Sequence, residues 1–187
     1  MKKGVLMSIY SVFLIGFSLI LFSCTKNNEE LIMSQINVIP KPAKTILKDG
    51  FLDLIHVNEV LLASGSEAET AIAHIVKKFL SPIKDLSIKT GDGGSPNALF
   101  IKIDSNLSLG EEGYSLSINR NNSIEIKSIS YAGLFYGYQT FRQICEPGLE
   151  GGKSGESTKI PCLEIVDKPV FSYRGMPLDF SRHFFDV

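Results

Sequence analysis

Four side chains near the C-terminal end of the sequence could do chemistry: Arg174, Asp179, Arg182 and His183. They lie in a stretch, residues 173–187, whose other side chains are largely apolar, and together they make it too polar for plain core. A guanidinium group is a rigid fork of hydrogen-bond donors that suits neighbouring oxygen atoms. The pattern predicts the first strand of a further domain that these residues do not complete.

Metal and cofactor chemistry have no support in the sequence. The histidines, His56, His74 and His183, are scattered, and none has a neighbour at metal-ligand spacing. We therefore expect no metal and no cofactor. An adjacent Asp-Glu pair and tryptophan are also absent from the sequence.

The N-terminus predicts export. Lys2 and Lys3 precede an apolar run, and residues 21–24 read Leu-Phe-Ser-Cys, which resembles the lipobox of bacterial lipoproteins. The resemblance implies a signal peptide over residues 1–23, a lipid on Cys24, and anchoring in the bacterial periplasm or outer membrane. An ordinary signal or an uncleaved anchor is the alternative.

The residues that follow the signal form a tether and then a domain. Residues 24–35 are polar at first and without a strong period, as in a tether. The chain has 19 Lys and Arg against 20 Asp and Glu, and loss of Lys2 and Lys3 with the signal leaves an excess of three acidic groups. This balance argues against a nucleic-acid partner.

Residues 36–166 are enough for one compact α/β (α+β) domain, at roughly 130 residues. Ile124 and Ile126 alternate with Glu125 and Lys127, which predicts a sheet covered on one face only, by the helices. Strands are expected over residues 51–55, 59–63, 98–104, 114–119, 123–129 and 159–166, and helices over residues 67–80 and 131–145.

The two predicted helices carry different signals. In the first, Ser66 and Glu69 have the spacing of a capping box, and the pattern places Glu69 on the solvent face with His74. In the second, Gly133 and Gly137 lie four residues apart, which predicts a close approach to a neighbouring element because glycine weakens a helix by about 1 kcal/mol relative to alanine.

The remaining cysteines, Cys145 and Cys162, lack a CxxC spacing. We favour two unpaired, half-buried residues over a disulfide, although export would permit a disulfide.

Three segments, in order, resemble the family 20 glycoside hydrolases, the β-N-acetylhexosaminidases. They are the proline-bearing residues 38–42, the helix of residues 130–144 and the stretch of residues 165–185. The resemblance implies a small leading α/β domain with helices packed on one face of its sheet. This domain would be followed, over residues 167–187, by the start of a truncated (β/α)8 barrel. It also implies a glycan substrate with a terminal N-acetylhexosamine.

The same resemblance implies roles for the four polar residues. Arg182 would hydrogen-bond hydroxyls of the terminal sugar at the C-terminal end of the first barrel strand. Arg174, Asp179 and His183 would support it through ion pairs and hydrogen bonds.

The family's mechanism needs groups that this sequence does not contain. In it the 2-acetamido oxygen of the substrate is the nucleophile, and an adjacent Asp-Glu pair further along the barrel supplies the acid and orients the amide. We therefore expect these 187 residues not to catalyse hydrolysis. Two hypotheses stay open: the front of a lipid-anchored exo-β-N-acetylhexosaminidase, or a non-catalytic lipoprotein module with a structural or glycan-contacting role.

Overall fold

The structure is a computed structural model that describes residues 36, 38–149 and 158–175. All that follows concerns the unit that starts at Val38. The predicted signal peptide, the Cys24 predicted to carry a lipid and the whole tether lie outside the described residues, as do Asp179, Arg182 and His183.

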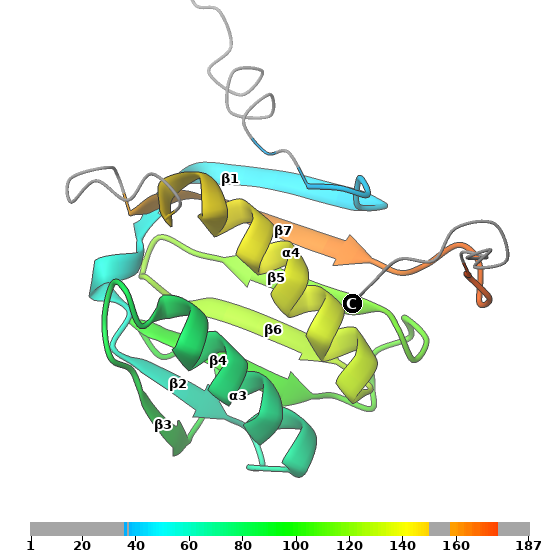
Figure 1. Cartoon of the computed structure of the whole chain (residues 1–187), viewed down its shortest axis with the longest axis horizontal. Helices are drawn as coiled ribbons and strands as arrows, with labels where there is room; N and C mark the ends of the chain where they lie inside the picture. Colours follow the sequence, from blue (N-terminus) through cyan, green and yellow to red (C-terminus); the bar gives the residue numbers. More distant parts are fainter. Residues whose placement is uncertain (1–35, 37, 150–157, 176–187) are drawn as a thin grey trace, which may run out of the picture. The chain divides into compact units, whose positions relative to one another are not determined.

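A seven-stranded sheet forms the centre of this unit, in the order β1-β7-β5-β6-β4-β2-β3 (Figure 1). The strands are β1 (Lys44–Asp53), β2 (Glu59–Leu62), β3 (Ser87–Thr90), β4 (Ala98–Ile103), β5 (Tyr114–Ile118), β6 (Ile124–Ser128) and β7 (Lys159–Asp167). The neighbouring strands β3, β2, β4 and β6 run parallel to one another. The pairs β6–β5, β5–β7 and β7–β1 are antiparallel.

Helices α3 (Glu67–Leu80) and α4 (Tyr131–Leu149) lie side by side on one face of the sheet (Figure 1). Helix α3 packs on β2 and β4, and α4 packs mainly on β5 and β6. The core between the layers includes Ile72, Leu99, Leu116, Ile126 and Phe141, all fully buried. This arrangement confirms the predicted α/β class, with its helices on one face of the sheet.

The opposite face of the sheet is covered in part by a glycine-rich loop. A Cβ on Gly91 would come within 3.2 Å of the Leu61 side chain, and one on Gly93 within 2.8 Å of Phe100. Leu61 and Phe100 are therefore buried although they point away from the helices, and they form a small cluster with Ala98.

Several predicted boundaries were wrong. The first strand is not residues 51–55: β1 begins at Lys44 and ends at Asp53, and a 3-10 turn follows over Leu54–His56. Asp53 caps that turn by accepting a hydrogen bond from the backbone N–H of Ile55. The short edge strand β3 was not predicted, and α4 continues past Cys145 to Leu149.

Glu69 does not face solvent, contrary to the prediction, whereas His74 is exposed. The Ser66 hydroxyl caps α3 by accepting from the Glu69 N–H (3.3 Å), but the carboxylate does not return to the Ser66 backbone. It accepts instead from the N–H groups of Ser64, Gly65 and Ile103, each at 2.9 Å, and from the Ser64 hydroxyl. Four donors offset the cost of burying the charge.

The close approach predicted for α4 is confirmed. A Cβ on Gly133 would lie 2.0 Å from Ser128 Oγ and 2.4 Å from the Gly113 carbonyl oxygen. One on Gly137 would lie 2.7 Å from the Ile126 side chain. Glycine at these two positions lets the helix backbone approach the ends of β5 and β6.

Two smaller observations complete the fold. Cys145 and Cys162 are each 1% exposed, so they are fully buried and not half-buried as predicted, and no disulfide joins them. Among the described residues, no helix combines the length and the apolar character needed to cross a membrane.

Candidate functional site

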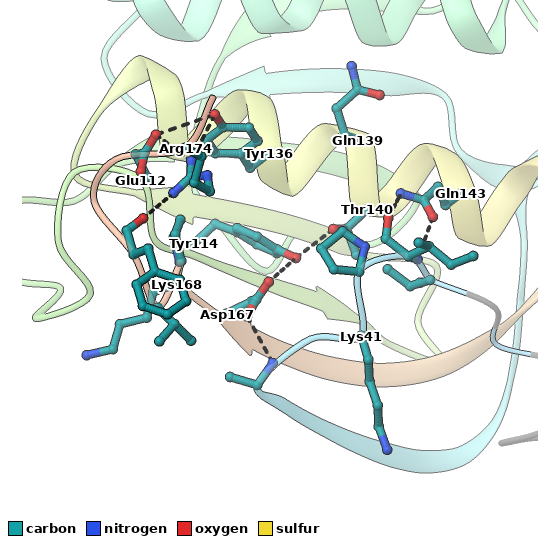
Figure 2. A pocket seen from close by; sticks show the side chains of 17 residues that line it. Lys41, Glu112, Tyr114, Tyr136, Gln139, Thr140, Gln143, Asp167, Lys168 and Arg174 are labelled. Carbon is teal, nitrogen blue, oxygen red and sulfur yellow. Dashed lines mark hydrogen bonds and ion pairs between the residues drawn. The ribbon is translucent and has the colours of Figure 1, made fainter. Parts of the chain in front are cut away.

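A pocket of about 620 Å³ lies where the chain enters and leaves the small domain (Figure 2). Its walls are the leading segment (residues 38–43), one side of α4, Glu112 and Tyr114 at the start of β5, and the trailing segment (residues 167–174). Segments more than a hundred residues apart in sequence thus meet at one site.

The leading segment is held to α4 and β7 by two polar side chains. Gln143 Oε1 accepts from the Ile39 N–H (2.8 Å), and its amide nitrogen donates to the Ile39 carbonyl (3.1 Å). Asp167 Oδ1 accepts from the Ala43 N–H (2.9 Å). These contacts fix the path of the chain into β1.

A chain of hydrogen bonds crosses the floor of the pocket (Figure 2). The Tyr114 hydroxyl lies 2.6 Å from Thr140 Oγ1 and 3.4 Å from Asp167 Oδ2. Burial raises the pKa of Tyr114 far above its ordinary value; the Thr140 bond opposes this shift, and the Asp167 carboxylate adds to it. Tyr114 therefore stays a neutral donor.

Arg174 ties the trailing segment to the opposite rim. Its guanidinium donates to Glu112 Oε1 (2.8 Å) and to the Phe171 carbonyl (2.6 Å). The Tyr136 hydroxyl lies 3.5 Å from the same guanidinium, whose carbon is 6.0 Å from the centre of the Tyr136 ring. The hydrogen bond to Glu112 is the main cause that raises the pKa of Arg174 above its ordinary value, and the Tyr136 contact adds to it. We call Arg174, Glu112 and Tyr136 the latch.

Both carboxylates in the pocket are engaged. Glu112 is paired with Arg174, and Asp167 holds Ala43 and Tyr114. The pocket therefore does not hold the two free carboxylates that most glycoside hydrolases place on either side of the bond they cleave. Over the described ranges, no group of His, Cys, Asp and Glu side chains could hold a metal ion.

Apolar surface dominates the rest of the pocket. Of the residues that line it, Val170 is 88% exposed, Ile39 is 78% exposed and Phe171 is 72% exposed. Large apolar side chains gathered at one hollow are typical of a surface that receives a partner.

A second hollow, of about 390 Å³, lies on the sheet face away from the helices. Lys102 and Lys127 lie opposite each other across β4 and β6. Each is paired with a carboxylate on its own strand or just after it, Lys102 with Asp104 and Lys127 with Glu125. Both lysines of this hollow are thus paired with neighbouring carboxylates, which fits a solvated sheet face.

Of the site residues predicted from sequence, the structure describes only Arg174. Its partners belong to the small domain. The sequence patterns did not mark Glu112, Tyr136, Gln143 or Asp167 as site residues. The one local signal was the position of Asp167 at the end of a strand and directly before Lys-Pro.

Comparison with known proteins supplies the family. Residues 35–168 match the family model described as glycosyl hydrolase family 20, domain 2. The chain belongs to glycosyl hydrolase family 20. Its seven-stranded sheet and two covering helices therefore form a family 20 domain. We call the pocket where the chain enters and leaves this domain the junction pocket.

The relatives are longer than this chain. A β-hexosaminidase of Porphyromonas gingivalis is 34% identical over 155 residues, which cover 81% of this chain and 20% of the relative. The family 20 β-N-acetylhexosaminidase of Streptomyces coelicolor superposes with a TM-score of 0.68 at 25% identity, over 81% of this chain and 30% of that one. A mutant Streptomyces plicatus β-hexosaminidase, in complex with its product GlcNAc, superposes with a TM-score of 0.64 at 26% identity over the same shares.

Proposed function

We propose that this chain is the leading part of an exo-β-N-acetylhexosaminidase that removes terminal β-linked GlcNAc or GalNAc from glycans. The observation that carries the proposal is the family match over residues 35–168, which ends where the trailing segment leaves β7. The Arg182 segment follows directly. The chain spans 20% of its Porphyromonas relative and 30% of the Streptomyces structures, which fits a domain that precedes the catalytic one.

The small domain and the polypeptide beyond it would have different roles, because the carboxylates of the junction pocket are already engaged. In the described small domain, Glu112 and Asp167 serve the junction pocket and have no role in bond cleavage. The acid and the amide-orienting carboxylate of a substrate-assisted, retaining mechanism would come from polypeptide beyond Val187. These 187 residues on their own would be inactive.

Sugar recognition would begin in the segment after Gly175. Arg182 would donate to vicinal hydroxyls of the terminal sugar, since its planar fork matches two neighbouring oxygens. Asp179 and His183 would hold that guanidinium in place. In the enzyme, Arg182→Ala should raise KM for the sugar substrate strongly while the melting temperature stays close to that of wild type. Arg182→Lys should recover only part of the lost affinity.

Export and anchoring form a separate part of the proposal. Their support is the sequence pattern of residues 1–24, with a basic start, an apolar run and Cys24 after Leu-Phe-Ser. The lipid on Cys24 and the tether over residues 24–35 would place the enzyme at the bacterial membrane, in the periplasm or at the outer membrane.

The coding sequence beyond the Val187 codon tests the enzyme proposal. We expect the reading frame to continue for several hundred residues and to supply an adjacent Asp-Glu pair and tryptophans. A stop codon directly after Val187, found in repeated reads, would contradict it. The product would then be a non-catalytic lipoprotein module.

A further inference from the structure

The latch fixes the direction in which the chain leaves the small domain. Arg174 lies in the last described stretch, one residue before Gly175, and its side-chain partners Glu112 and Tyr136 belong to the folded domain. The second donor contact, to the Phe171 carbonyl, closes a tight loop over residues 171–174. A guanidinium that serves both contacts holds position and angle at once.

The same loop keeps apolar side chains open beside the pocket. Phe171 and Tyr173 lie in the loop, and Val170 precedes it; all three remain more than two-thirds exposed. Ile39, held by Gln143 on the other side, is equally open. An ordered apolar rim around a hollow fits a partner that buries it.

We propose that this pocket is the docking surface for the polypeptide of the same chain that follows Gly175, and that Arg174 is the positioning residue of this junction. The proposal deepens the proposed function and rests on it. Continuity favours this occupant, because the trailing segment is itself one wall of the pocket. So does composition, since the residues directly after it include Met176, Leu178 and Phe180.

Arg174 therefore acts on the sugar site at a distance. The latch sets the direction in which the chain continues at residue 176. It thereby determines where Arg182, six residues further on, can reach. Its part in the enzyme is to position Arg182 without contact to the sugar.

Limited proteolysis tests the latch in the 187-residue chain, independently of any activity. Arg174→Ala should speed chymotrypsin cleavage after Phe171 and Tyr173 at least tenfold, because the loop loses the side chain that holds it to Glu112. Arg174→Lys, which keeps the charge opposite Glu112, should have a smaller effect. Lys78→Ala, which removes a positive charge from the exposed side of α3, serves as the control and should leave the cleavage rate unchanged. Equal cleavage rates in Arg174→Ala and wild type overturn the latch.

A comparison with the longer product tests the docking. Residues 38–43 and 168–174 should exchange at least tenfold more slowly in the continuous product than in the 187-residue chain. Equal exchange in both proteins overturns the proposal, as does a reading frame that stops after Val187. Protection that instead grows with concentration of the 187-residue chain would show that a second copy occupies the pocket, and would also overturn it.

Kinetics separate positioning from mere stability. In the continuous product, Arg174→Ala should raise KM for a nitrophenyl N-acetyl-β-glucosaminide several-fold, with kcat less affected and the melting temperature within a few degrees of wild type. Unchanged KM overturns the positioning role. An inactive wild-type product would count against the proposed function, while the proteolysis and exchange experiments would still report on the latch and the docking.

Discussion

Replacing Glu69 by glutamine removes a buried negative charge with almost no change in shape. The carboxylate is fully buried and accepts from four donors: Oε2 takes the Ser64 N–H, the Ser64 hydroxyl and the Gly65 N–H, and Oε1 takes the Ile103 N–H. Glutamine keeps one acceptor oxygen and puts an NH2 group in place of the other. At least one of the backbone donors must then face another donor.

The cost follows from these contacts. Loss of one hydrogen bond to a charged acceptor costs about 1.5–3 kcal/mol, and a buried donor without a partner costs about 1–3 kcal/mol more. We expect Glu69→Gln to lower the free energy of unfolding by about 3–5 kcal/mol, or the melting temperature by roughly 10–15 °C for a domain of this size. Urea denaturation followed by circular dichroism measures it.

Glu67→Gln is the matched control, because Glu67 lies in the same first turn of α3 and is exposed. It loses only a surface charge near the helix N-terminus and should cost less than about 1 kcal/mol. If Glu69→Gln costs no more than Glu67→Gln, the four hydrogen bonds do not stabilise the fold as argued.

The pH dependence of stability adds a second readout for Glu69. Burial on its own raises the pKa of this carboxyl, but the bonds from Ile103, Ser64 and Gly65 outweigh burial and hold the pKa below its ordinary value of 4.5. A depressed pKa gives stability that is present above the unfolded value and is lost as the pH falls through the folded one. The stability difference between wild type and Glu69→Gln should therefore shrink as the pH falls below about 4.5; a constant difference would contradict the assignment.

Three further predictions concern the helix contact, the pocket floor and the N-terminus. Gly133→Ala should destabilise the domain by about 2–3 kcal/mol in urea titrations despite its better helix propensity, because its Cβ meets a backbone carbonyl; Gly137→Ala, which meets a movable Ile126 side chain, should cost less, and the reverse order would refute this reading. Absorbance at 295 nm should rise equally in wild type and Tyr114→Phe up to about pH 11, since an ordinary tyrosine titrates near 10 and Tyr114 lies well above that; a smaller rise in the variant would contradict this. Cys24→Ala should abolish acyl labelling and membrane fractionation, and continued labelling in the membrane fraction would exclude Cys24 as the anchor.

Local patterns in the sequence predicted both helices and most of the strands, although β1 was misplaced and β3 was missed. Helix α3 spans the predicted residues 67–80 and begins at its predicted cap, and the alternation around Ile124 continues through strand β6. The burial of Glu69 could not be predicted this way, because a helical period sorts residues by polarity and the donors that offset its charge come in part from Ile103, on another strand.

The residues of the junction pocket could not be predicted from local sequence patterns, for a different reason. Gln143 and Ile39 are 104 residues apart, and Arg174 and Glu112 are 62 apart, so nothing in either neighbourhood signals the contact. Strand β1 begins in a stretch of mixed polarity at the sheet edge, where one-sided burial leaves a weak alternation. The sequence predicted the position of the junction near Asp167, but not the side chains that build it.

Hydrolysis measured side by side for the 187-residue chain and for the product of the continuous reading frame tests the central claim most directly. With a nitrophenyl N-acetyl-β-glucosaminide and the matching galactosaminide, we predict nitrophenol release by the longer product and none above buffer by the 187-residue chain. Release by the 187-residue chain alone would contradict the assignment of catalysis to polypeptide beyond Val187. An inactive longer product that contains the Asp-Glu pair would contradict the hexosaminidase function itself.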